Sequence, residues 1–156
     1  MRIELTEDLE LVASVLQHPD LFDRITDDAG AIMSKEELLA NLNDGSFYFK
    51  VMDDNGVVKG IFGCSETEDG SLELHISMLP EGRGAFGAWA FKRLITFLFE
   101  NTTYTKLVGR VPAIKGNVLA FISAIGFKLE YMIEKEFIKN GVEYDMYYLS
   151  MLKQGA

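Results

Sequence analysis

The stretch that most constrains the fold of this chain lies between residues 72 and 99, where an alternating segment, a glycine-rich turn and an apolar segment follow one another. Apolar and polar residues alternate from Leu72 to Ser77, which is the period of a half-buried strand. Apolar residues then recur at helical spacing, and we expect one helix over Ala85–Phe99. A strand that continues through a short turn into a long helix indicates a mixed α/β fold built around this unit.

The turn between the strand and the helix carries Gly82, Gly84 and Gly87. Glycines at such a turn let backbone amides approach an anion without an intervening side chain. The first turn of a helix also leaves its amides unpaired and carries the positive end of the helix dipole. We therefore expect a phosphate or a pyrophosphate to be favoured at this turn.

The rest of the chain divides into short segments without a linker or repeat, which predicts a single domain over residues 1–156. Alternation and turn signals predict further strands at Arg2–Leu5, Phe47–Met52, Val57–Ser65, Lys106–Val111, Phe127–Phe137 and Glu143–Met151. Helix signals predict a helix capped by Thr6, a second over Ser34–Leu42 and a buried one over Val118–Ile125. The acidic stretch Gln17–Met33 is predicted to be a loop, with Pro19 ending the first helix.

Composition excludes several classes of protein. The net charge of −9 argues against binding to a nucleic-acid backbone. No apolar run reaches the about 18 residues that cross a bilayer, and the N-terminus lacks a signal sequence, so we expect a cytoplasmic protein that does not bind membranes. The single cysteine, Cys64, allows no internal disulfide and is expected to be a packing residue. Only His18 and His75 are present, in different elements, so no metal site is predicted.

The strand, the Pro-x-x-Arg-Gly turn and the helix together resemble the acyl-CoA signature of the GCN5-related N-acetyltransferase (GNAT) superfamily, Gln/Arg-x-x-Gly-x-Gly/Ala. Arg83 falls on the first position of that signature and Ala88 on the last. Phe86 occupies the position of the middle glycine, so its ring must turn away from where a pyrophosphate would lie. The neighbouring Gly84 and Gly87 allow the turn to shift by one residue.

The C-terminal half extends the resemblance, so that the matches span about residues 47 to 151. Asn117 and Gly126-Phe127, followed by a hairpin at Lys139-Asn140-Gly141, are similar to the Asn…Gly-Phe ending of the superfamily. Two positions depart from it. Ile122 stands where many members have a tyrosine that acts as acid, and Asn117 lies closer to the glycine than in many members.

The resemblance implies a mixed, mostly antiparallel central sheet flanked by about four helices, with a splay between the fourth strand at Leu72 and the fifth at Lys106. It implies acetyl-CoA as co-substrate, with the pantetheine arm inserted into the splay like an additional strand. The implied cofactor-binding residues are Ile76, Met78, Arg83, Gly84, Ala85, Phe86, Gly87, Ala88 and Asn117.

Acetyl transfer to an amine requires the neutral amine, so a nearby general base is useful. Glu73 and His75 project from one face of the strand beside the implied splay and are the catalytic candidates. The alternative for Glu73 is a structural ion pair with a lysine on the next strand, such as Lys59, and for His75 a structural hydrogen bond. The general acid stays open among Tyr144, Tyr147 and Tyr148.

Three functional hypotheses follow from the resemblance. The first is an acetyl-CoA-dependent N-acetyltransferase that acts by direct transfer on a small-molecule amine or a protein amine. The second is a catalytically inactive GNAT-like structural or assembly protein, of the kind found in phage-encoded relatives linked to head assembly. The third is a regulatory module that binds acyl-CoA. The last hairpin is in addition a plausible sheet-edge contact for a homodimer.

Overall fold

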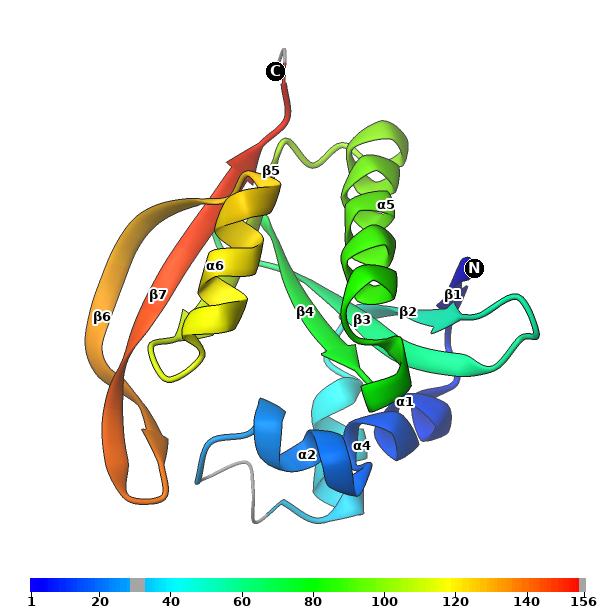
Figure 1. The fold of residues 1–156 in the computed structure, drawn as a ribbon, viewed down its shortest axis with the longest axis horizontal. Helices are drawn as coiled ribbons and strands as arrows, with labels where there is room; N and C mark the ends of the chain where they lie inside the picture. Colours follow the sequence, from blue (N-terminus) through cyan, green and yellow to red (C-terminus); the bar gives the residue numbers. More distant parts are fainter. Residues whose placement is uncertain (29–32, 155–156) are drawn as a thin grey trace.

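The computed structural model describes residues 1–28 and 33–154, with the backbone alone at residues 23–25. Within these residues, seven strands form one sheet in the order β1-β2-β3-β4-β5-β7-β6 (Figure 1). Every neighbouring pair is antiparallel except β4 and β5, which are parallel. The strands are β1 (Arg2–Thr6), β2 (Phe47–Met52), β3 (Val58–Glu66), β4 (Leu72–Met78), β5 (Lys106–Pro112), β6 (Lys128–Lys139) and β7 (Val142–Leu152). The sheet is therefore mixed and mostly antiparallel, as predicted.

Helices cover both faces of this sheet. They are α1 (Leu9–Leu16), α2 (Pro19–Ile25), α4 (Lys35–Leu42), α5 (Ala85–Asn101) and α6 (Gly116–Ile125), with a 3-10 turn, η1, over Pro80–Gly82. Phe49 and Phe62 pack with α5 in one apolar cluster, whereas their chain neighbours Tyr48 and Ile61 pack with α1 and α4 in another. Because successive strand residues point to opposite faces, the two groups of helices lie on opposite faces. No helix in the described part of the chain is long and apolar enough to span a membrane.

The loop predicted over Gln17–Met33 is wrong for its first half, because α2 occupies Pro19–Ile25. Pro19 is the first residue of α2, a position where a missing N–H leaves no helical bond unmade. The His18 ring caps the helix, since its Nδ1 accepts a hydrogen bond from the Asp20 amide at 3.1 Å. The proline thus begins a new helix as well as ending the first. Residues 29–32 of the predicted loop lie outside the described residues.

The main core lies between the sheet and the helices α5 and α6. Phe91 of α5 is at its centre, with the rings of Phe62, Phe121 and Phe127 all within 6.3 Å of its own, centre to centre. Phe91 itself is 2% exposed. Cys64 is buried in the same cluster, as expected for a packing residue. Each aromatic ring of this size removes about 150–250 Å² of surface from water, so these rings contribute a large share of the burial in this core.

The strands β4 and β5 pair over only two positions, Leu72 with Leu107 and Glu73 with Val108. Beyond Glu73, β4 stays paired with β3 and β5 stays paired with β7, so the two strands separate along the rest of their length. This confirms the splay between the fourth and fifth strands. We call the paired end, where both strands begin, the closed end, and the end where they separate the open end.

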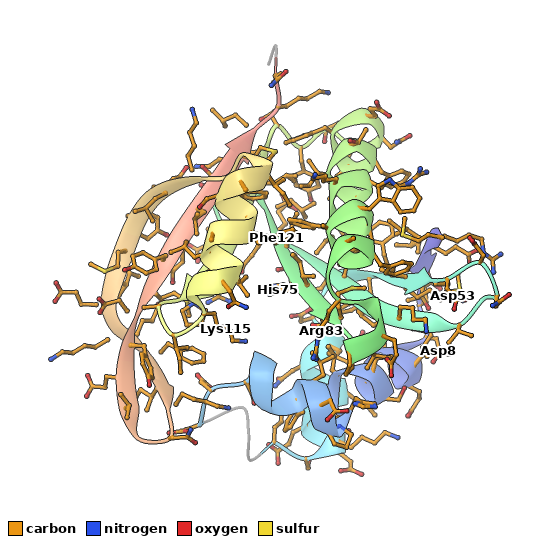
Figure 2. The ribbon with its side chains drawn as sticks, in the orientation of Figure 1. Asp8, Asp53, His75, Arg83, Lys115 and Phe121 are labelled. Atoms are coloured by element: carbon orange, nitrogen blue, oxygen red, sulfur yellow. The ribbon has the colours of Figure 1, made fainter. Side chains whose placement is uncertain are left out.

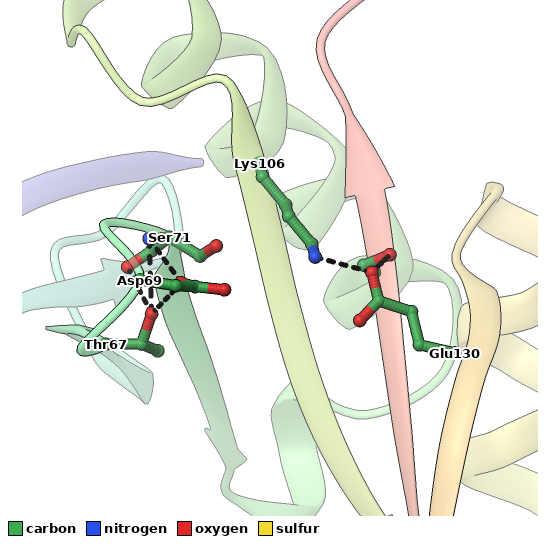
Figure 3. Close-up of polar contacts among 6 residues, drawn as sticks. Thr67, Asp69, Ser71, Lys106 and Glu130 are labelled. Carbon is green, nitrogen blue, oxygen red and sulfur yellow. Dashed lines mark hydrogen bonds and ion pairs between the residues drawn. The ribbon is translucent and has the colours of Figure 1, made fainter.

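Polar side chains at the closed end are bonded to one another (Figure 3). The Asp69 carboxylate accepts hydrogen bonds from the Thr67 hydroxyl at 2.6 Å and from the Ser71 amide at 3.0 Å. Hydrogen bonds from Thr67 and Ser71 lower the pKa of Asp69 to about 2. On the other side, the Lys106 ammonium lies 2.6 Å from the Glu130 carboxylate. The closed end is thus held by local and cross-strand polar contacts.

Candidate functional site

A cavity of about 600 Å³ occupies the open end of the β4–β5 pair. Its walls include His75 and Ile76 from β4, Arg110 from β5, Ile122 from α6 and Asp44 from the segment before β2. The cavity exists because the two strands carry no hydrogen-bonded pairs beyond Glu73. It combines an apolar wall with a few charged groups, which is the usual character of a small-molecule site.

Three charged or titratable side chains meet across the splay. The Arg110 Nε lies 3.0 Å from Glu73 Oε1 and 3.1 Å from Oε2, and His75 Nε2 lies 3.5 Å from Glu73 Oε2. The alternation of β4 brings Glu73 and His75 to the same face, as predicted. The predicted structural alternative for Glu73, an ion pair with Lys59, is wrong, since Lys59 pairs with Asp53 at 3.7 Å. The partner of Glu73 is Arg110.

Burial is the main influence on the imidazole of His75, and it lowers the pKa of this ring. The positive charge of Arg110 lowers the pKa further, whereas the carboxylates of Glu73 and Asp44 raise it. Half of the His75 side-chain surface nevertheless stays open to the cavity, near the centre of the molecule (Figure 2). The ring is therefore neutral at pH 7 and accessible from the cavity.

The first turn of α5 has no side-chain cap. Gly84 is the N-cap residue with a φ of 77°, and within the described chain no side chain bonds to the amides that follow it. The first intrahelical bond runs from the Ala88 amide to the Gly84 carbonyl at 3.0 Å, so the amides of residues 85–87 have no partner within the helix. Gly84 and Ala85 are exposed. The turn is suited to an anion, because unpaired amides and the helix dipole act together there.

The fold matches that of known acetyltransferases. A structure of spermidine N-acetyltransferase from Vibrio cholerae in complex with CoA and spermine matches with a TM-score of 0.81 and 20% identity over 97% of this chain and 95% of that one. A point mutant of the same enzyme matches with a TM-score of 0.79 and 18% identity over 97% and 95% of the two chains. This is the GNAT fold. At this identity the likeness establishes the fold, and no family model or curated protein matches the sequence.

Two of the three glycines at the GNAT-like turn are required by packing, which corrects the expectation that all three open the turn to an anion. A Cβ at Gly82 would lie 2.7 Å from the Lys59 carbonyl oxygen, and one at Gly87 would lie 2.9 Å from the Gly82 carbonyl oxygen. Both glycines are buried. Only Gly84 has open space around its Cβ position, and its positive φ explains why glycine is favoured there.

Phe86, which replaces the middle glycine of the GNAT signature, is half-buried and packs against the main core. Its ring is therefore partly turned toward the core from the first turn of α5. Ala88, on the last position of the signature, is also half-buried. The phenylalanine ring at this position is thus accommodated by packing against the core.

Arg83 holds the turn against the rest of the protein. Its Nε donates to the Met78 carbonyl at 3.2 Å, and its Nη2 donates to the Asp20 carbonyl of α2 at 2.9 Å (Figure 2). Asn117 lies exposed in the first turn of α6. Arg83, Met78 and Asn117 are not among the residues that line the cavity, so their predicted contacts with a cofactor stay predictions.

Tyr148 is the tyrosine nearest to the charged cluster among the three predicted candidates, since it pairs with Arg110 between β5 and β7. Its hydroxyl contacts both carboxylate oxygens of Glu136, at 2.6 and 2.8 Å. Burial and the hydrogen bond to Glu136 raise the pKa of Tyr148 to about 12. The phenol therefore keeps its proton at neutral pH, as a general acid must before it acts.

The segment after α2 is hydrogen-bonded to the tip of the β6–β7 hairpin (Figure 1). The Asp28 carboxylate accepts hydrogen bonds from the amides of Asn140 at 2.8 Å and Gly141 at 2.9 Å. Lys139 donates from Nζ to the Thr26 carbonyl at 2.8 Å. The two amide bonds lower the pKa of Asp28, which keeps the carboxylate ionised. Because Thr26 also lines the cavity, this contact lies at the cavity wall.

Arg110 and Asp44 are residues of the site that were not predicted from the sequence. Arg110 is an isolated charge between Gly109 and the apolar Val111 in β5, and a buried-strand pattern with one such charge is the signal that could have found it. The described residues contain no group of three or more His, Cys, Asp or Glu side chains that could hold a metal ion.

Proposed function

We propose that this protein is an acetyl-CoA-dependent N-acetyltransferase that transfers an acetyl group directly to a primary amine. The observation that carries this proposal is the separation of β4 and β5 beyond Glu73, which opens a cavity between them. The first turn of α5, which has no side-chain cap, follows β4 and η1 in the chain. The shared fold with an acetyltransferase whose structure contains CoA and spermine supports the same reading.

Acetyl-CoA is proposed as the substrate that occupies the splay. Ile76 and Ser77 line the cavity on the unpaired edge of β4, where an extended pantetheine arm can run alongside the strand. The unpaired amides of residues 85–87 would receive the diphosphate. The packing of Phe86 against the core leaves room for this contact. The residues present therefore fit an acyl-CoA.

The acceptor is proposed to be a small amine that carries more than one positive charge. Asp27 and Asp44 line the cavity, and the chain carries a net charge of −9. Carboxylates around a cavity attract ammonium groups and lower the cost of removing them from water. Spermine in the Vibrio cholerae structure supports a polyamine as the first compound to test.

The chemistry requires a proton acceptor for the incoming ammonium and a proton donor for the departing thiolate. Glu73 and His75 are the proposed acceptors, because they meet at the point where the strands separate. Tyr148 is the proposed donor among the three tyrosines, because it pairs across the sheet with Arg110, which lines the cavity. Direct transfer needs no covalent enzyme intermediate, in keeping with the buried Cys64, whose thiol pKa burial raises to about 12.

The test is a thiol-release assay with acetyl-CoA and a panel of spermidine, spermine, single amino acids and lysine peptides, together with calorimetry of acetyl-CoA binding. We expect binding, and release of CoA that depends on the amine, with polyamines fastest. Binding without release for any amine would favour a regulatory module. Neither binding nor release at millimolar acetyl-CoA would overturn both readings and leave a structural protein with the GNAT fold.

A further inference from the structure

The two proposed proton acceptors are not placed equivalently. His75 lines the cavity with half of its side-chain surface exposed, whereas the Glu73 side chain is 13% exposed and is absent from the cavity lining. Both carboxylate oxygens of Glu73 are within 3.1 Å of Arg110 Nε. An amine in the cavity therefore meets the imidazole before it meets the carboxylate.

The orientation of the ring assigns its two nitrogens to different tasks. Nε2 is the nitrogen that faces Glu73, at 3.5 Å from Oε2. A neighbouring carboxylate favours the tautomer that carries the proton on the nitrogen facing it. His75 then has its proton on Nε2, and the lone pair of Nδ1 is available to accept a proton.

We propose that His75 is the catalytic base of the transfer, and that Glu73 and Arg110 are positioning residues that orient its ring and balance its charge. This inference rests on the proposed function. One proton of the substrate ammonium passes to His75 Nδ1, and the neutral amine nitrogen forms a bond to the thioester carbon of acetyl-CoA. The C–S bond breaks, the Tyr148 hydroxyl gives its proton to the departing sulfur and recovers a proton as the second one leaves the nitrogen, and His75 returns its proton to water. The products are the acetylated amine, CoA and one proton.

Three charged groups face His75. They are Glu73 on its own strand, Arg110 on β5 and Asp44 before β2. On β2, Tyr48 is uncharged, since burial raises the pKa of its phenol. Glu73 and Asp44 favour the protonated ring and Arg110 opposes it, so removing Glu73 or Arg110 must move the titration of His75 in opposite directions.

The experiment uses NMR titration of the ring C–H signals and the pH profile of kcat/KM for spermidine in the same set of proteins. The set is the wild type, Glu73→Gln, Arg110→Gln and, as a control at the closed end, Glu130→Gln. The chain has only two histidines, so loss of one signal in His75→Gln assigns both, and His18 serves as an internal reference. His75→Gln is in addition expected to lower transfer by about 100-fold or more.

We expect Glu73→Gln to move the His75 titration, and with it the acidic limb of kcat/KM, to lower pH. Arg110→Gln should move both to higher pH, and Glu130→Gln should move neither. If transfer persists and the limb does not follow the His75 titration, the assignment of His75 as base is overturned while the transferase stands. Loss of transfer at every pH in Glu73→Gln would instead make Glu73 the base. If the opposite NMR shifts occur but the wild type transfers no acetyl group, the proposed function itself fails.

Discussion

The two ends of the β4–β5 pair contain polar side chains of similar kinds in different surroundings. At the closed end, Asp69 is bonded by Thr67 and Ser71, and Lys106 is paired with Glu130 (Figure 3). Where the open end begins, Glu73 of the last pair meets His75 and Arg110 beside a cavity. The strands are hydrogen-bonded to each other at the first end and separate at the second.

This difference distinguishes the polar groups that stabilise the fold from those that are available to bind a ligand or to react. A polar group whose bonds are made by its own turn or by the opposite strand contributes to stability and has little left to offer a ligand. A charged group at a cavity with perturbed protonation is a candidate for function. We therefore expect substitutions at the closed end to change stability, and those at the open end to change ligand binding or transfer.

The largest expected effect is a difference in stability between alanine substitutions at two positions on the same face of β4. Leu72 at the closed end is fully buried, and its replacement by alanine should lower the free energy of unfolding by about 2–5 kcal/mol. Ile76 at the open end is half-buried and lines the cavity, so Ile76→Ala should cost less than about 2 kcal/mol. Urea unfolding at 25 °C measures both. Equal losses would show that the open end is packed as tightly as the closed end and would break the comparison.

The second effect compares two glycines with positive φ, Gly84 at 77° and Gly70 at 83°, each with open space at its Cβ position. Alanine at either position should cost about 1–3 kcal/mol of stability through backbone strain. Only Gly84→Ala, at the first turn of α5, should also weaken CoA binding, by about tenfold. Calorimetry with CoA on both variants is the measurement. A similar loss of affinity in Gly70→Ala would mean that CoA does not depend on this turn.

The smallest effect concerns the pH dependence of stability at the closed end. The pKa of Asp69 is depressed to about 2 in the folded protein, below its ordinary value of 3.8. Its contribution is therefore complete above the ordinary value and is lost as the pH falls toward 2. Asp69→Asn should be less stable than the wild type at pH 6, and the gap should narrow between pH 4 and pH 2. Glu68→Gln, in the same turn, is the control. A gap that stays constant in urea unfolding would contradict this assignment.

Parts of the structure formed by residues close together in the sequence could be predicted, whereas contacts between distant residues could not. The strand, turn and helix from Leu72 to Phe99 are local patterns, and the structure contains all three. The contact between Glu73 and Arg110 joins residues 37 positions apart, and it depends on how β4 and β5 are aligned. The hydrogen bond from the Asn140 amide to the Asp28 carboxylate joins residues 112 positions apart, and no local sequence pattern indicates it.

The structure differs from the prediction at two further places, because proline and glycine each occur for more than one structural reason. Pro19 ends one helix pattern and begins another, and only the cap made by His18 distinguishes these roles. Gly82 is needed because the Lys59 backbone approaches it closely, a contact that involves a strand far away in the sequence. A glycine in a phosphate-binding pattern therefore does not by itself indicate contact with a phosphate.

The most direct measurement of the central claim is a crystal structure of the protein with acetyl-CoA. We predict that the pantetheine arm lies between β4 and β5 beside Ile76, with the diphosphate on the amides of residues 85–87 and the Phe86 ring against the core. A structure in which Phe86 covers those amides, or in which acetyl-CoA at saturating concentration lies outside the splay, would contradict the account.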